Sequence, residues 1–113
     1  MLIGYVLMGV GAAILGTQLV NRRRLGRAVA RMLRDGATVV DVRSPAEYSS
    51  GHSARSVNIP LDELPRPAPE LNRDLGLVVC CASGVRASRA AHWLARQGFT
   101  QVLNAGSWRN LPN

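Results

Sequence analysis

The stretch Val78-Val79-Cys80-Cys81-Ala82-Ser83-Gly84-Val85-Arg86-Ala87-Ser88 carries the clearest structural signal in this chain of 113 residues. Its β-branched start predicts a buried strand, and small apolar residues spaced three and four apart from Ala87 onward predict a helix. The loop between them contains Gly84 and closes at Arg86. Loop amides and the start of the helix would point at the Cys81 sulfur, which favours anion binding and the thiolate form. We therefore interpret this stretch as a candidate active site with Cys81 as its nucleophile.

The two cysteines of the chain are adjacent, so a framework of structural disulfides is not expected. Successive side chains of a strand point to opposite faces of the sheet, which separates Cys80 from Cys81. We therefore expect Cys80 to pack in the core, although a resolving role beside Cys81 is an alternative.

The net charge of +7 is unevenly distributed along the chain. All 14 basic residues are arginines, and six of them lie between Arg22 and Arg34. From Gly36 onward, eight arginines stand against six acidic residues, so this part has a net charge of only +2. Because the charge belongs to one short segment, we do not expect nucleic-acid binding by the rest of the chain.

Residues 1–20 contain no charged side chain. About 20 apolar residues in a helix span the hydrocarbon core of a bilayer, so we predict a transmembrane helix over residues 1–21. A buried or interfacial helix is the alternative. The arginines that follow directly predict a single-pass protein of the inner (cytoplasmic) membrane with its domain on the cytoplasmic side. Small residues four apart, Gly9–Ala13 and Ala12–Gly16, would allow helix pairing in lipid and hence a homodimer.

Beyond this segment, we predict a basic juxtamembrane helix over residues 22–35 and a small domain over residues 36–113, whose first helix falls within residues 25–35. Ser44 is expected to cap a helical turn that starts at Pro45, with Glu47 completing a capping box. Strands alternating with helices indicate an α/β fold with a mainly parallel sheet flanked by helices. The predicted strands cover residues 38–42, 57–60, 77–80 and 101–104.

A set of short motifs, taken in order, resembles a rhodanese domain. They are Asp41-Val42-Arg43, Glu47-Tyr48, Gly51-His52, Asn58-Ile59-Pro60, the loop from Cys81 to Arg86, Gly98-Phe99, Val102 and Trp108. The resemblance covers roughly residues 25–108 and implies a rhodanese-like domain behind the membrane anchor. It implies a sulfurtransferase of the thiosulfate sulfurtransferase type, which moves sulfane sulfur through a cysteine persulfide and needs no metal and no organic cofactor.

The resemblance also implies roles for individual residues. Cys81 would attack a small sulfur-donor anion such as thiosulfate and pass the sulfur to a thiol or cyanide acceptor. The persulfide would be held by the charge of Arg86 and by backbone amides of the loop. These amides belong to Ala82, Ser83, Gly84, Val85 and Arg86. Four residues separate Cys81 from Arg86, one fewer than in the related cysteine phosphatases and arsenate reductases, which favours sulfur over a tetrahedral oxyanion.

Four further residues are possible supporting members of the site. Ser88 follows Arg86 by two positions, whereas the family often has serine directly after the arginine. Asp41 and Arg43 are expected mainly in a structural ion network, and His52 mainly in a structural role. The alternative to catalysis is a membrane-tethered module that binds a partner or carries persulfide sulfur without turning over thiosulfate.

Overall fold

The computed structural model describes residues 21–66 and 71–113. The predicted transmembrane helix over residues 1–21 therefore lies, apart from its last residue, outside the described part of the chain. Among the described residues, no helix has both the length and the apolar character needed to cross a bilayer.

The centre of the domain is a sheet of four parallel strands in the order β2-β1-β3-β4. The strands are β1 (Thr38–Asp41), β2 (Ser56–Asn58), β3 (Leu77–Cys81) and β4 (Val102–Ser107). The β-branched residues Val39, Val40, Val78 and Val79 fill the two central strands and are fully or almost fully buried. This arrangement confirms the predicted α/β fold with a parallel sheet.

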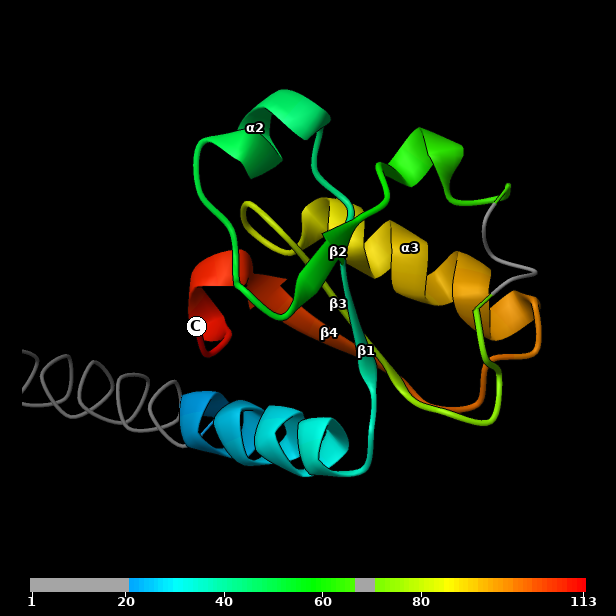
Figure 1. Cartoon of the computed structure of the whole chain (residues 1–113). Helices are drawn as coiled ribbons and strands as arrows, with labels where there is room; N and C mark the ends of the chain where they lie inside the picture. Colours follow the sequence, from blue (N-terminus) through cyan, green and yellow to red (C-terminus); the bar gives the residue numbers. More distant parts are fainter. Residues whose placement is uncertain (1–20, 67–70) are drawn as a thin grey trace, which may run out of the picture.

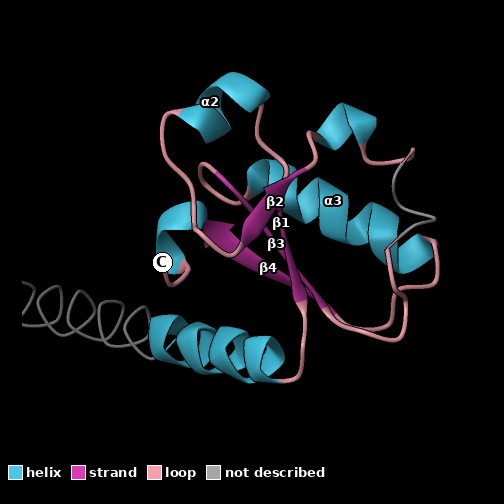
Figure 2. Ribbon diagram, viewed as in Figure 1, coloured by secondary structure: helices cyan, strands magenta, loops and turns pink. Residues whose placement is uncertain are grey.

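Helical elements cover both faces of the sheet (Figures 1 and 2). One face carries α3 (Val85–Arg96) and the 3-10 turn η1 (Leu61–Glu63), which pack through Leu94 and Leu64. The other face carries the helix of residues 21–34 and the 3-10 turn η3 (Trp108–Asn110), with Val29 at the centre of the contact. The sheet is therefore the middle layer of the domain, and each of its faces contributes to a separate hydrophobic core.

The short helix α2 (Pro45–Ser49) follows β1 and begins with the predicted capping box. The Ser44 hydroxyl accepts a hydrogen bond from the Glu47 amide, and the Glu47 carboxylate accepts one from the Ser44 amide. These bonds satisfy amides that a helix start otherwise leaves without partners.

All four strands differ from the predicted bounds at one end or both. β1 ends at Asp41 rather than Val42, and β4 begins at Val102 rather than Gln101. β3 continues through Cys81, because this residue still pairs with Ser107 of β4. β4 itself runs to Ser107 rather than Asn104, because a bulge at its end lets it continue past Gly106. β2 begins at Ser56, which pairs with Val39, and ends before Ile59.

Candidate active site

The Cys81 loop joins the end of β3 to the start of α3 at the carboxyl edge of the sheet, where sites of parallel α/β folds gather. Residues 82–84 make the whole connection, and Gly84 has φ of 106°. This left-handed backbone conformation favours glycine. A Cβ at Gly84 would also lie 3.1 Å from the Cα of Gly106, so the loop can lie directly on β4 only because position 84 has no side chain.

Backbone amides surround the Cys81 sulfur. The Gly84 N–H donates to Sγ over 2.9 Å, and the Ala87 N–H donates over 3.4 Å. Cys81 is only 1% exposed, so these donors act in a largely water-free environment. Ala87 was not among the predicted anion-binding residues, whereas Gly84 was.

The two adjacent thiols have opposite acidities. Burial opposes ionisation of Cys81, but hydrogen bonds from loop amides outweigh it and lower the pKa of this thiol. In decreasing order of effect, the amides are those of Ala87, Gly84, Ser83 and Arg86. Burial raises the pKa of Cys80 to about 12, and the nearby Asp41 carboxylate adds to the rise. These opposite shifts favour Cys81 over Cys80 as the candidate nucleophile, and the burial of Cys80 fits the core position predicted for it.

Arg86 forms an ion pair with Glu47 of α2. The guanidinium nitrogens Nη1 and Nη2 donate to the two carboxylate oxygens over 2.7 and 2.9 Å. The hydrogen bonds from Arg86, and then those from Ser44, lower the pKa of Glu47 to about 2. About a third of each side chain remains exposed, so a cationic edge of Arg86 still meets solvent. The predicted local role of Glu47 was that of a capping residue, and its ion pair with Arg86 was not predicted.

Asp41 and Arg43 form the buried ion network that was expected of them. Arg43 Nη2 donates to Asp41 over 2.8 Å, and its Nε contacts both oxygens of the same carboxylate. The guanidinium also donates to the carbonyl of Gly51 over 2.7 Å and lies 4.8 Å from the ring centre of Trp108. Through these contacts, the Arg43 side chain links the end of β1 to the turn after α2 and to η3. The position of the pair therefore indicates a structural role.

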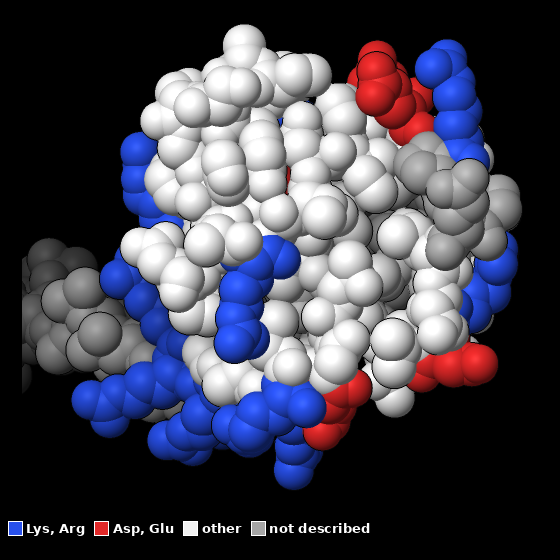
Figure 3. All heavy atoms as spheres, viewed as in Figure 1, with Lys and Arg blue, Asp and Glu red and all other residues white. Residues whose placement is uncertain are grey.

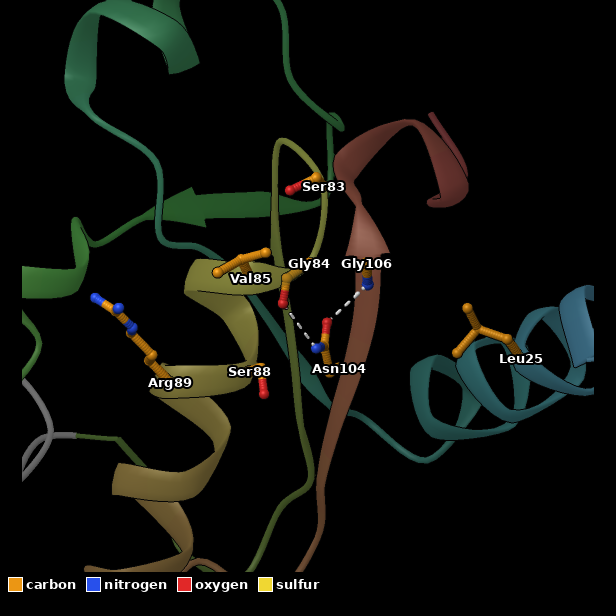
Figure 4. A pocket seen from close by; sticks show the side chains of 8 residues that line it. All are labelled: Leu25, Ser83, Gly84, Val85, Ser88, Arg89, Asn104 and Gly106. Atoms are coloured by element: carbon orange, nitrogen blue, oxygen red, sulfur yellow. Dashed lines mark hydrogen bonds between the residues drawn. The ribbon is translucent and has the colours of Figure 1, made fainter.

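The side chains of the two other predicted supporting residues, His52 and Ser88, form no hydrogen bond with Cys81 in the described part of the chain. His52 is exposed, stacks on Tyr48 with ring centres 3.7 Å apart, and has Nδ1 2.7 Å from the Tyr48 carbonyl oxygen. Ser88 lines a shallow hollow on the β4 side of the loop, together with Asn104 and Leu25 (Figure 4). Ala82, in the loop, and Val85, the first residue of α3, were also predicted for the site, and both side chains are exposed.

Asn104 was not among the predicted site residues. Its side-chain amide donates to the Gly84 carbonyl oxygen over 3.0 Å, and its oxygen accepts from the Gly106 N–H over 2.8 Å (Figure 4). The only hint in the sequence is an asparagine two residues before a glycine, which is typical of a turn stabilised by its own side chain.

The arrangement places a thiol of lowered pKa and several fixed N–H donors at one point. A sulfur attached to Cys81 would place negative charge close to N–H groups that already face the thiol, so the site suits nucleophilic attack followed by storage of an anion. Within residues 21–66 and 71–113, no cluster of three histidine, cysteine or acidic residues could bind a metal ion.

Comparison with known proteins agrees with this geometry. Residues 26–110 match the model of a family described as "Rhodanese-like domain". GlpE of Pseudomonas paraeruginosa, named a thiosulfate sulfurtransferase, is 35% identical over 94 residues, covering 79% of this chain and 86% of GlpE. A structure titled "rhodanese with anions from E. coli" superposes with a TM-score of 0.63 at 29% identity, covering 67% of this chain and 92% of the other.

Other relatives are longer than the matched region. YrkF of Bacillus subtilis, described as a proposed sulfur carrier protein, is 37% identical over 70 residues, which cover 62% of this chain. The chain spans 38% to 62% of the length of YrkF and of two further bacterial relatives matched at 35% to 37% identity.

Proposed function

The chain belongs to the rhodanese-like domain family, and we propose that it transfers sulfane sulfur from a thiosulfate-like anion to a thiol or cyanide through a persulfide on Cys81. One observation carries this proposal above the others. The sulfur of Cys81 accepts hydrogen bonds from Gly84 and Ala87, which lower the pKa of the thiol despite its burial.

The first half-reaction follows from a stable thiolate. Cys81–S⁻ attacks the outer sulfur of thiosulfate, a new S–S bond forms, and sulfite leaves with the electron pair of the broken S–S bond. The product, Cys81–S–S⁻, keeps one negative charge next to the loop amides. Because this step removes no proton from a neutral thiol, it requires no general base, and His52 has no task in it.

The second half-reaction restores the enzyme. Cyanide or a thiolate attacks the outer sulfur and leaves as thiocyanate or a persulfide, while the electron pair of the S–S bond returns to Cys81. The same amides that stabilised the persulfide stabilise this leaving thiolate. We propose that the exposed edge of Arg86 attracts the anionic donor, while Glu47 fixes the position of the guanidinium.

Steady-state turnover of thiosulfate and cyanide tests the proposal on the full chain in detergent. Cys81→Ser should abolish thiocyanate formation, because a serine hydroxyl is not ionised at neutral pH and forms no persulfide. Cys80→Ser is the matched control and should retain most of the activity. Turnover that survives Cys81→Ser would overturn the assignment.

The second candidate function is a carrier that stores persulfide sulfur without turning over thiosulfate. It is favoured by the similarity to YrkF, whose description is that of a sulfur carrier. A folded chain that accepts sulfur from a protein persulfide, but yields no thiocyanate from thiosulfate, would select this alternative.

For location, we propose a single-pass protein whose residues 1–21 anchor it in the inner membrane, with the domain on the cytoplasmic side. All six arginines between Arg22 and Arg34 are exposed, and none forms an ion pair with another described residue. Arginines gather along this edge of the molecule (Figure 3). Such a cluster of positive charge would be attracted electrostatically to anionic lipid headgroups. Release of the full chain from membranes by alkaline carbonate would contradict the anchor.

A further inference from the structure

The end of β4 is irregular beside the Cys81 loop. Val79 of β3 pairs with Asn104, but Cys81, two residues later, pairs with Ser107, three residues later. β4 therefore contains one extra residue, and Gly106 within this bulge has φ of 76°. Bulges of this kind redirect the backbone and are frequent next to active sites.

Asn104 connects the bulge to the loop with both ends of its carboxamide. Its oxygen accepts from the Gly106 N–H over 2.8 Å, which fixes the orientation of the side chain. Its nitrogen can then donate only in the other direction, and it does so to the Gly84 carbonyl oxygen over 3.0 Å. Figure 4 shows these two bonds spanning the space between β4 and the loop.

The Gly84 carbonyl oxygen accepts two hydrogen bonds, one of them from Asn104. The other is the first hydrogen bond of α3, from the Ser88 N–H over 2.9 Å, so Asn104 and the helix hold the carbonyl jointly. In a planar trans peptide the carbonyl and the following N–H point in opposite directions. Holding the carbonyl toward β4 therefore turns the Val85 N–H away from β4. It also fixes ψ of Gly84, the residue whose own N–H donates to Cys81.

We propose that Asn104 is a positioning residue for the sulfur-transfer site, which acts by holding Gly84 so that the loop amides converge on the sulfur of Cys81. The inference rests on the proposed function of Cys81. It adds a residue from a different strand, 23 positions further along the chain, that touches neither the thiol nor the donor. The essential property is hydrogen-bond donation to Gly84, not merely the filling of space.

The test compares three variants of the full chain in detergent. Asn104→Ala removes both bonds of the carboxamide. Asn104→Asp has nearly the same shape and keeps an acceptor for Gly106, but it places a carboxylate oxygen against the Gly84 carbonyl. Asn110→Ala is the matched control, because Asn110 Nδ2 donates over 2.9 Å to the Ala105 carbonyl in the same bulge and leaves the loop alone.

The decisive readout is the pH dependence of Cys81 alkylation, followed by peptide mass spectrometry. The titratable groups that interact electrostatically with the Cys81 thiolate are Arg86 of α3 and Cys80 of β3. None of the variants replaces either residue. Asn104→Ala should shift the alkylation midpoint upward by roughly half a pH unit, because misdirected amides stabilise the thiolate less. Asn104→Asp should shift it at least as far.

Thiosulfate turnover at neutral pH should fall about tenfold in both Asn104 variants and stay near the native value in Asn110→Ala. An unshifted midpoint in folded Asn104→Asp would overturn the proposal, as would an equal shift in Asn110→Ala. If Asn104→Ala does not fold, Asn104→Ser takes its place, because serine is neutral and too short to keep the bond to Gly84 and so gives a shift free of the charge that Asn104→Asp adds. The alkylation midpoint needs no turnover, so it still tests Asn104 if the native chain proves inactive on thiosulfate.

Discussion

Two neighbouring cysteines at the end of β3 show how surroundings set the chemistry of one functional group. Cys81 faces the α3 side of the sheet, where loop amides donate to its sulfur and lower its pKa. Cys80 faces the other side, where burial and the Asp41 carboxylate raise its pKa to about 12. Both residues are almost completely buried, at 1% and 0% exposure. Burial disfavours the thiolate at both positions, and only at Cys81 do hydrogen bonds from backbone amides outweigh it.

The largest expected difference between the two regions is in alkylation by iodoacetamide. Because only the thiolate reacts, at pH 8 Cys81 should be modified at least on the order of a thousandfold faster than Cys80. Quantitative peptide mass spectrometry over time measures both rates in one sample. Comparable rates at the two positions would show that the loop amides do not distinguish them.

A second prediction concerns the ion network on the Cys80 side. Asp41→Asn removes the carboxylate that neutralises Arg43, a side chain 5% exposed, and leaves a buried positive charge. The free energy of unfolding should fall by about 3–5 kcal/mol. Urea unfolding measures the loss, and Glu47→Gln, which breaks the more exposed pair with Arg86, is the control and should lose less. Equal losses in the two variants would mean that the buried pair stabilises the fold no more than the exposed pair does.

A third prediction concerns the loop on the Cys81 side. Gly84→Ala places a Cβ 3.1 Å from the Gly106 Cα and forces alanine into a φ of 106°. The change should destabilise the fold by about 1–3 kcal/mol and slow thiosulfate turnover more than its effect on folding explains. Gly26→Ala, where no atom lies within 4 Å of the added carbon, is the matched control. Native turnover in Gly84→Ala would show that the loop tolerates a different backbone path.

The smallest expected effect is on acid stability. The folded-state pKa of Glu47, about 2, lies below its ordinary value of 4.5, so the pair with Arg86 stabilises the fold above pH 4.5. This contribution should be lost as the pH falls from 4.5 toward 2. Glu47→Gln keeps a capping side chain but removes the charge, so its melting temperature should decline less steeply across this interval. Parallel declines in the two proteins would exclude a role for the pair.

Local patterns in the sequence were sufficient for the strand, loop and helix around Cys81 and for the capping box at Ser44. These features depend on residues within a few positions of one another, so their spacing reveals them. The choice of Cys81 over Cys80 also followed from the alternation of side chains along a strand.

Contacts between distant segments could not be predicted in the same way. Glu47 and Arg86 are 39 residues apart, and Asn104 and Gly84 are 20 residues apart. Each pair meets only because parallel strands bring their carboxyl ends to one edge of the sheet. Glu47 was already explained by its cap, which concealed its second partner, and the register shift that places Asn104 under the loop leaves no pattern in the sequence.

The central claim is that the amide-lined thiol, and not its neighbour, accepts sulfur. The most direct measurement is the mass of the full chain and of its cysteine peptide after incubation with thiosulfate and removal of the excess. A persulfide adds one sulfur atom, about 32 Da, and fragmentation should place it on Cys81 alone. No gain in mass, or a sulfur on Cys80, would contradict the account.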